Sequence, residues 1–342
     1  MQKKYLLYLL LVVFINCKTT QFSEKQEVSK GDFTIAFGSC NKHDVNNRLW
    51  DDVLAAQPDV WIWGGDIIYA DTDDPRKIAE MYEEQKSVPG YAQVLREIEV
   101  IGTWDDHDYG LNDGGIEFEA KGESQQVFLD FMDVAKTDPR RRREGVYASH
   151  DYQTPEGDVK ILVLDTRFFR SALTPSRVKG KRYEPGIYGE GTVLGDEQWT
   201  WLEKELNSST ADFNIIVSSI QFLSDQHGFE TWGNFPHEVD KLKKTISESG
   251  ASGVIVLSGD RHISEFSGTA VEGLNYPLID FTSSGLTHVY SSFSGEPNPS
   301  RIGEVVAKKS FGLLQIHFNS RRVEMEMIGD EGKVLNQLSQ EY

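Results

Sequence analysis

Short apolar runs alternate with longer amphipathic segments along most of this chain. Near-continuous apolar runs at 33–37, 60–63 and 253–258 predict buried strands, and helical spacing of apolar residues predicts helices at 123–134 and 236–249. Strands that alternate with helices are typical of an α/β fold. The other predicted elements are helical segments at 45–56, 71–86 and from 195 onward, strands at 99–104, 146–152, 160–164, 213–219 and 278–281, and an antiparallel pair at 311–318 and 323–328.

Four of the predicted strands end in side chains that commonly bind metals. The carboxyl ends of strands in an α/β sheet lie at one edge, where binding sites gather. Three carboxylates within the segment 105–108 would repel one another unless a cation neutralised them. We therefore expect a metal centre at this edge of the sheet. Its candidate residues are Cys40, Asp66, Tyr69, Asp105, Asp106, His107, Asp108, Asp260 and His262.

Each of these segments also has a purely structural interpretation. Asp66 could cap the helix that follows it, Cys40 could be a buried core thiol, and the segment 105–108 could be a solvated acidic loop. Thiolate, phenolate and imidazole ligands suit iron or zinc, whereas carboxylates suit calcium, magnesium or manganese. A carboxylate shared by two cations would create a two-metal site suited to displacement at phosphorus. Ligand residues at four strand ends together favour the metal centre.

The charge of the chain narrows the range of partners. Its 54 acidic and 35 basic residues give a net charge of −19, which argues against nucleic acids and anionic membrane surfaces as ordinary partners. The exception is the run Arg140–Arg143. A solvated basic turn explains this run, and Arg143 near a metal site could alternatively bind an anionic phosphate.

The amino-terminal segment resembles a bacterial export signal. Two lysines precede an apolar run from Tyr5 to Ile15, which is shorter than the roughly 20 residues of a membrane-spanning helix. Cys17 follows this run as in a lipoprotein signal, although Asn16 replaces the usual small residue. We expect Cys17 to carry lipid and to tether the protein in the cell envelope, as a periplasmic or outer-membrane lipoprotein. A plain secretory signal, cut elsewhere, is the alternative.

Three regions follow from this interpretation. Residues 1–17 are expected to form the signal peptide, residues 18–30 a flexible polar tether, and residues 31–342 a single large domain. The chain has two cysteines, so an acylated Cys17 would leave Cys40 without a disulfide partner. A thiol in that situation is expected to be buried and inert, or held by a metal.

Six segments together resemble the PhoD-like alkaline phosphatases of the calcineurin-like metallophosphoesterase superfamily, and they span about 33–285. The resemblance implies a four-layer αββα sandwich, in which two mixed β-sheets are flanked by helices. It also implies Fe3+ with Ca2+ (zinc, manganese or magnesium being possible substitutes) and hydrolysis of phosphomonoesters and phosphodiesters by metal-activated hydroxide. The segments are Gly38-Ser39-Cys40, Gly65-Asp66-Ile67-Ile68-Tyr69, Trp104-Asp105-Asp106-His107-Asp108, Leu164-Asp165-Thr166-Arg167, Leu194-Gly195-Asp196-Glu197-Gln198-Trp199 and Ser258-Gly259-Asp260-Arg261-His262.

The resemblance also implies a role for each matching residue. Cys40 and Tyr69 would ligate iron, Asp66 would bridge the metals, and Asp106 would bind the second metal. His262 matches the last histidine of a Gly-His-x-His motif. The first histidine of that motif is replaced here by Asp260, which is expected to bind metal as well.

His107 matches the histidine that assists the phosphate and the leaving oxygen, and Asp108 could orient it. Two histidines of the wider superfamily have no counterpart here. The opening Asp-x-His is replaced by Ser39-Cys40, and the middle histidine is missing near 218–221, with His227 a few residues on. Residues expected to support the metals or the substrate are Asn41, Asp105, Asp108, Asn112, Arg143 and Arg167.

Two classes of function are compatible with these residues. The first is a phosphoric ester hydrolase acting on small-molecule or lipid-headgroup esters, either as a phosphatase or as a phospholipase-like phosphodiesterase. The second is a lipid-anchored calcium-binding protein without turnover. His107 and the Cys40–Tyr69 pair favour the hydrolase, because calcium binding alone requires neither.

Overall fold

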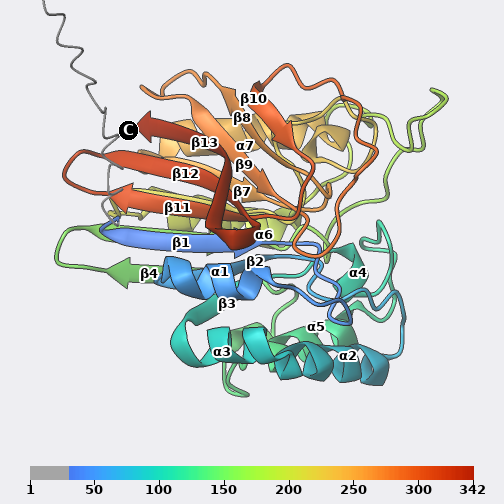
Figure 1. The fold of residues 1–342 in the computed structure, drawn as a ribbon. Coiled ribbons are helices and arrows are strands. Elements are labelled where there is room, and N and C mark those ends of the chain that lie inside the picture. Colours follow the sequence, from blue (N-terminus) through green and yellow to red (C-terminus); the bar gives the residue numbers. More distant parts are fainter. Residues whose placement is uncertain (1–30) are drawn as a thin grey trace, which may run out of the picture. The chain divides into compact units, whose positions relative to one another are not determined.

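Two β-sheets packed face to face form the centre of the structure, and helices cover their outer faces (Figure 1). The computed structural model describes residues 31–342, so the expectations for Cys17, the signal peptide and the tether concern residues outside the described part. Both sheets contain parallel and antiparallel pairs. The four-layer αββα arrangement expected from the resemblance is therefore confirmed.

The first sheet has six strands in the order β13-β12-β11-β1-β2-β3. Strands β1, β2 and β3 form its parallel half. The predicted antiparallel pair of β11 and β12 extends the sheet on the other side, where β11 pairs with β1. The strands span β1 Phe33–Gly38, β2 Val60–Gly64, β3 Glu99–Thr103, β11 Phe311–His317, β12 Arg322–Gly329 and β13 Lys333–Glu341.

The second sheet has seven strands in the order β10-β8-β9-β7-β6-β5-β4. Strands β5, β6, β7 and β9 are parallel, and the other three are antiparallel additions at the two edges. The strands span β4 Ala148–Gln153, β5 Asp158–Val163, β6 Phe213–Val217, β7 Val254–Ser258, β8 Ser264–Thr269, β9 Leu278–Ser283 and β10 Arg301–Val306.

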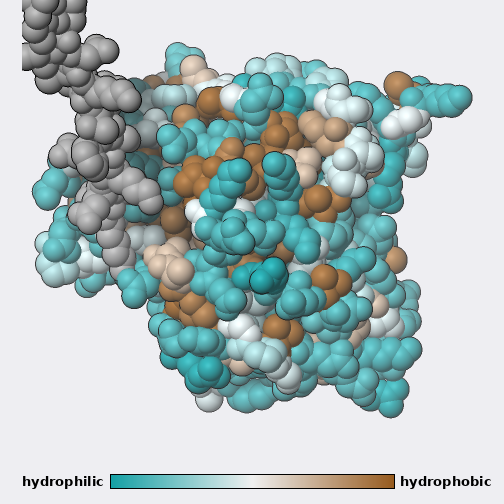
Figure 2. All heavy atoms as spheres, in the orientation of Figure 1, coloured by the Kyte–Doolittle hydropathy of each residue, from teal (hydrophilic) through white to brown (hydrophobic). Residues whose placement is uncertain are grey.

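Helices α1, α2, α3 and α5 cover the first sheet, and α6 and α7 cover the second. Among residues 31–342, the helices are all too short or too polar to cross a membrane. The face shown in Figure 2 is mostly hydrophilic, with smaller apolar areas between the polar side chains. The helices span α1 Leu49–Ala56, α2 Pro75–Ser87, α3 Pro89–Glu97, α4 Asp106–Tyr109, α5 Lys121–Phe131, α6 Gly195–Asn207 and α7 Pro236–Ser249, with short 3-10 turns at Pro139–Arg141, Trp232–Asn234 and Asp330–Gly332.

Strand β2 shows how the layers are held together. Its side chains alternate, so that Val60 and Ile62 lie in the core between the sheets while Trp61 and Trp63 face the helices. Trp50 of α1 packs edge-on against both tryptophans, and its ring centroid lies 5.1 Å from that of Trp61 and 5.5 Å from that of Trp63. Fully burying a large apolar side chain contributes about 1.5–3 kcal/mol, so these contacts fix the helical layer firmly.

Some elements differ from the sequence-based prediction. Helix α1 begins at Leu49 rather than near Val45, because Asn47 Oδ1 accepts the Leu49 N–H at 3.1 Å and ends the preceding loop there. Strands β8, β10 and β13 were not predicted. Their segments lack long apolar runs, and β10 and β13 are partly exposed strands at the sheet edges.

Gly102 makes the close pairing of β2 and β3 possible. It pairs with Trp63 and has a φ of 151°, and a Cβ added to it would lie 2.5 Å from Trp63 O. We expect Gly102→Ala to lower the free energy of unfolding by about 1–3 kcal/mol, as overpacking typically does. Denaturant unfolding measures this loss. The control is Gly122→Ala in α5, whose added Cβ would meet nothing within 4 Å. Equal stabilities of the two variants would contradict the packing argument.

Candidate metal centre

The predicted strand ends of both sheets meet at one place. Three groups of candidate ligands form there, and within each group the ligand atoms lie within 4.8 Å of one another. Asp66 belongs to two of the groups, as does Asp106, so the groups are contiguous. The groups are Cys40, Asp66 and His262; Asp66, Asp106 and His107; and Asp105, Asp106 and Asp260.

Sulfur, phenol and imidazole gather on one side of this cluster. Cys40 is completely buried, and its Sγ lies 3.3 Å from Asp66 Oδ2. The Tyr69 hydroxyl lies 3.3 Å from the same carboxylate oxygen and 3.1 Å from His262 Nε2. Ser284 Oγ accepts the His262 N–H at 2.7 Å and lies 3.0 Å from Cys40 Sγ. This side has the donor types that suit iron or zinc.

Several candidate ligands lie where the backbone is left-handed. Cys40, Asp66, Asp260 and His262 have φ values of 58°, 51°, 69° and 54°. Such conformations are uncommon for residues with a side chain, and they gather where function requires an unusual geometry. Gly65 precedes Asp66 with a φ of 93°, and a Cβ there would collide with Asp105. The left-handed turns let each strand end direct its side chain into the shared centre.

In the absence of cations, the protein disfavours the charged forms of Asp66 and Asp260. Burial raises the pKa of Asp66 well above its usual range, and the nearby charges of Cys40 and Asp106 add to the rise. Burial also raises the pKa of Asp260 to about 8, although the charge of Arg261 opposes this. Asp105 Oδ2 is buried and has no hydrogen-bond partner. An orphaned oxygen beside further buried carboxylates fits a bound cation, so the donor set suits metal ions.

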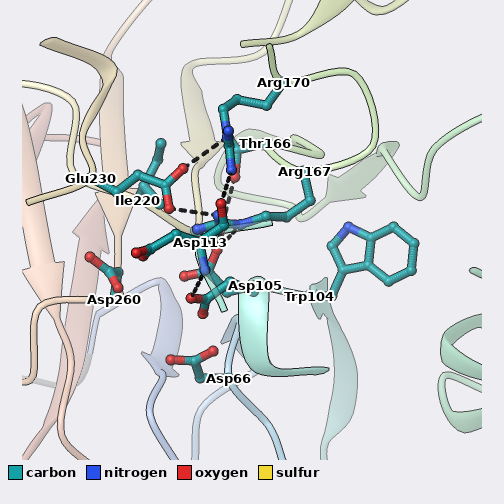
Figure 3. A network of polar contacts seen from close by, with 12 residues as sticks. Asp66, Trp104, Asp105, Asp113, Thr166, Arg167, Arg170, Ile220, Glu230 and Asp260 are labelled. Atoms are coloured by element: carbon teal, nitrogen blue, oxygen red, sulfur yellow. Dashed lines mark hydrogen bonds and ion pairs between the residues drawn. The ribbon is translucent and has the colours of Figure 1, made fainter. Parts of the chain in front are cut away.

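A buried network of ion pairs lies next to the candidate ligands and holds Asp105 in place (Figure 3). Arg167, which is fully buried, contacts Asp105 Oδ1 through Nε at 2.5 Å and Glu230 Oε2 through Nη1 at 2.6 Å. Arg170 pairs with the other oxygen of Glu230 at 3.0 Å. Ser219, two residues after the end of β6, donates a hydrogen bond to Asp105 Oδ1 at 2.7 Å. Asp105 is thereby held with one oxygen bonded and the other free.

His107 lies at the mouth of the centre and is oriented by Asp71. Its Nδ1 lies 2.8 Å from Asp71 Oδ1, and its ring lies against Tyr69 with centroids 4.1 Å apart. Burial alone would lower the pKa of His107, but the hydrogen bond to Asp71 and the charge of Asp106 raise it to about 9. The expectation that Asp108 orients His107 is wrong. Adjacent side chains on the short helix α4 point in different directions, and Asp108 points inward.

Asp108 instead fixes the backbone of the strand ends. It accepts hydrogen bonds from the N–H groups of Asp66 and Asp105 at 3.3 and 2.6 Å, and from Ile67 at 3.2 Å. Asn41 has a similar supporting position, since its N–H donates to Asp66 O at 2.8 Å. These carboxylate and amide groups hold the turn that carries Asp66.

Asn112 and Asp113 hold Asp106. The Asn112 side chain and the Asp113 N–H donate to Asp106 Oδ2 at 2.7 and 2.6 Å. Arg143 lies elsewhere, with its guanidinium carbon 3.5 Å from the centre of the Tyr147 ring, and it is not among the residues that line the pocket at the centre. Its basic run therefore forms a structural turn and does not face the candidate ligands.

Sequence reasoning missed several contributors. His288 follows β9, and its ring centroid lies 4.4 Å from that of His262 and 5.0 Å from that of Tyr69. Its position after a strand was the available signal. Asp71 and Glu230 lie in loops, where no local pattern marks them. His227 makes no contribution to the ligand groups, because its Nε2 bonds to Ser224 O at 3.1 Å.

A pocket of about 450 Å³ borders the centre. Asp106, His107, Asp260 and His262 line one part of it, and Arg182, Phe229, Val289 and Tyr290 are among the residues that line the rest. Candidate metal ligands and an oriented histidine are thus accessible from one cavity. Such a cavity can bind the phosphate group of an ester at its polar part and the substituent of the same ester along the remaining wall.

Comparisons with known proteins identify relatives in sequence and in fold. Alkaline phosphatase D of Bacillus subtilis (strain 168) is 25% identical over 191 residues, which cover 48% of this chain and 31% of that protein's length. The solved structure of PhoD superposes with a TM-score of 0.71 at 17% identity, covering 90% of this chain and 68% of that one. GAP50, the anchor in the inner membrane complex of Plasmodium, has the same fold, with a TM-score of 0.59 at 11% identity over 91% and 89% of the two chains.

The family model described as PhoD-like phosphatase matches residues 35–326. This range includes β1, the turn at Asp66, helix α4 and the turn at Asp260, so it contains every candidate ligand of the centre. Because the match extends over most of its length, the chain belongs to the PhoD-like phosphatase family.

Proposed function

We propose that the protein hydrolyses phosphate esters at the pocket beside Asp106 and His107, as a phosphomonoesterase, a phosphodiesterase or both. The observation that supports this most strongly is the convergence of thiol, phenol, imidazole and carboxylate groups from four strand ends on one accessible cavity. Membership of the PhoD-like phosphatase family supports the same activity. A protein that only bound calcium would need neither the buried thiol of Cys40 nor an oriented histidine.

The donor types divide the centre into two parts. Cys40, Tyr69 and His262 would hold Fe3+, and Asp66, which belongs to two of the ligand groups, would serve both parts. The oxygens of Asp105, Asp106 and Asp260 would hold Ca2+, with zinc, manganese or magnesium as alternatives at either position. Bound cations would supply Lewis acidity toward the phosphoryl group.

His107 would act on the leaving oxygen. Because its Nδ1 is bonded to Asp71, the proton that it can give to a substrate is the one on Nε2. Asp71 keeps the ring oriented and stabilises its cationic form, as carboxylates beside catalytic histidines do. Proton donation by a positioned group typically contributes about 10²–10⁴-fold to the rate.

The compartment is also part of the proposal. The signal-like segment before Cys17 supports export and acylation at that cysteine, which would tether the enzyme to a membrane of the cell envelope. Substrates would then be small phosphate esters or lipid headgroups outside the cytoplasm. The alternative is secretion of the unmodified domain.

The activity is tested with protein purified without chelators. Initial rates on nitrophenyl phosphate and on bis(nitrophenyl) phosphate measure the two ester classes separately, and mass spectrometry measures the metals in the same sample. We expect turnover that is lost after metal removal and restored by adding iron and calcium. Tight calcium binding without turnover of any ester would support the binding protein instead.

Cys40→Ser tests the soft side of the centre. We expect the variant to lose most of its iron or zinc and most of its activity, because a neutral hydroxyl is a much poorer ligand for these metals than a thiolate. Metal analysis and esterase assays measure both losses, and circular dichroism should show an unchanged fold. Iron and zinc contents equal to those of the wild type would rule out Cys40 as a ligand.

His107→Ala tests the assignment of the leaving-group histidine. We expect turnover of an alkyl phosphate to fall by about 10²–10⁴-fold, and turnover of a nitrophenyl ester to fall much less, because nitrophenolate leaves without a proton. Metal content should stay at the wild-type level. His317→Ala is the matched control, since His317 also lies beside a carboxylate, Glu324 at 3.8 Å, but outside the pocket. Equal losses on both substrates together with loss of metal would show that His107 is a ligand.

A further inference from the structure

A basic loop borders the pocket and contributes one residue to its wall. We call this loop, Thr174–Glu184, the arm; its two sides are joined by a bridge between Pro175 and Tyr183 and by a hydrogen bond from Ser176 N to Arg182 O at 2.9 Å. It is part of the yellow-green segment that projects at the right of Figure 1. The arm has four basic residues and one acidic residue in a chain whose net charge is −19.

Arg182 lies at the base of the arm, and its backbone is fixed against the pocket wall. Its N–H and that of Tyr183 both donate to Gly228 O, at 2.8 and 3.0 Å. Its guanidinium Nη2 lies 2.5 Å from Asp113 Oδ2, which also accepts the Tyr183 hydroxyl at 2.6 Å. The Asp113 N–H in turn holds the candidate ligand Asp106. Arg182 therefore has a fixed position in the pocket wall, outside the candidate ligands, although it belongs to a projecting loop.

The guanidinium of Arg182 has N–H groups that remain available to a ligand. Half of its side chain is exposed, and Asp113 is joined to one of its three nitrogens. The other arginine that lines the pocket, Arg261, is mostly buried and already engaged. Both oxygens of Glu296 lie 2.9 Å from its Nη2, and its guanidinium lies over the Phe229 ring at 4.2 Å. Arg182 is thus the pocket arginine that is available to an anion.

The pocket has room for more than the scissile phosphate. Its volume of about 450 Å³ falls within the range of roughly 300–1,000 Å³ that is typical of sites for larger small molecules. Asp106 and Asp260 line it as candidate ligands, whereas Arg182 and Phe229 belong to the separate loops of its wall. A phosphate ester bound at the candidate ligands would extend its substituent along this wall.

We infer that Arg182 determines specificity by binding a second anionic group, a phosphate or a carboxylate, on the substituent of the ester. The inference rests on the proposed function. Guanidinium binds such oxyanions with paired hydrogen bonds, and the surplus of positive charge on the arm favours their approach to an otherwise acidic protein. The preferred substrates are then esters with two anionic groups, one of which is cleaved.

Three substrates that differ in one group test this inference. Phenyl phosphate has no second anion, para-carboxyphenyl phosphate adds a carboxylate, and para-(phosphonomethyl)phenyl phosphate adds a phosphonate that cannot be hydrolysed. If the wild type prefers diesters, the methyl diester of each of these three compounds is used in place of the monoester. We expect R182Q to lower kcat/KM for the two bis-anionic esters by about ten- to hundredfold, mainly through KM, and to leave phenyl phosphate within about threefold. The two bis-anionic esters distinguish a carboxylate from a phosphate as the preferred second group.

Two further variants separate binding from structure. R177Q removes the same charge from the arm at a side chain that is 92% exposed and outside the pocket, so it should preserve the preference. Y183F removes a hydrogen bond to Asp113 without removing the cation, and it should preserve the preference as well. If Y183F reproduces the selective loss, the effect belongs to Asp113 and not to anion binding.

The remaining outcomes also decide the question. Equal losses of R182Q on all three esters would place Arg182 at the scissile phosphate or in the support of Asp106, and no loss on any ester would exclude a substrate contact. Both results overturn the inference while the hydrolase proposal stands. A wild type that hydrolyses no ester, mono or di, rejects the proposed function and this inference with it.

Discussion

Carboxylates with little access to solvent are concentrated at one edge of the two sheets, and the turns around them are built to hold them there. Asp66, Asp105 and Asp106 are buried together with the Cys40 thiol, Asp260 lies half-buried beside them, and burying unpaired carboxylates is costly. Arg167 compensates Asp105 and leaves one of its oxygens without a partner. Cations would offset the remaining charge. The left-handed turns and the hydrogen bonds that fix the strand ends are then the means of holding these groups close.

Both sheets contribute to this centre, so the interior core determines its geometry. Cys40 and Asp66 follow strands of the first sheet, whereas Asp260 follows a strand of the second. The apolar layer between the sheets, which includes Phe37 and Phe281 in edge-to-face contact at 4.9 Å, keeps the two sets of strand ends in register. Tight packing transmits small displacements, so a change in this core is expected to move the ligands relative to one another.

The sequence predicted the parts of the candidate centre that depend on local patterns. Apolar runs located the strands, and the residue types shortly after them suggested Cys40, Asp66 and the Asp260 turn as candidate ligands. Contacts between distant loops were not predictable, because neither the pairing of Asp71 with His107 nor that of Glu230 with Arg167 leaves a local signal. Strands β10 and β13 were missed for a related reason, since their partial exposure removes the apolar pattern on which a strand prediction depends.

Anomalous diffraction can show whether metal ions neutralise this centre. Crystals of the protein purified without chelators, measured on both sides of the iron and zinc absorption edges, would locate such ions. We expect an anomalous scatterer bonded to Cys40 Sγ and an Asp66 oxygen, with further density among Asp105, Asp106 and Asp260. A well-ordered pocket with no scatterer, in which ordered waters and hydrogen-bonded carboxylic acids occupy these positions in active protein, would contradict it.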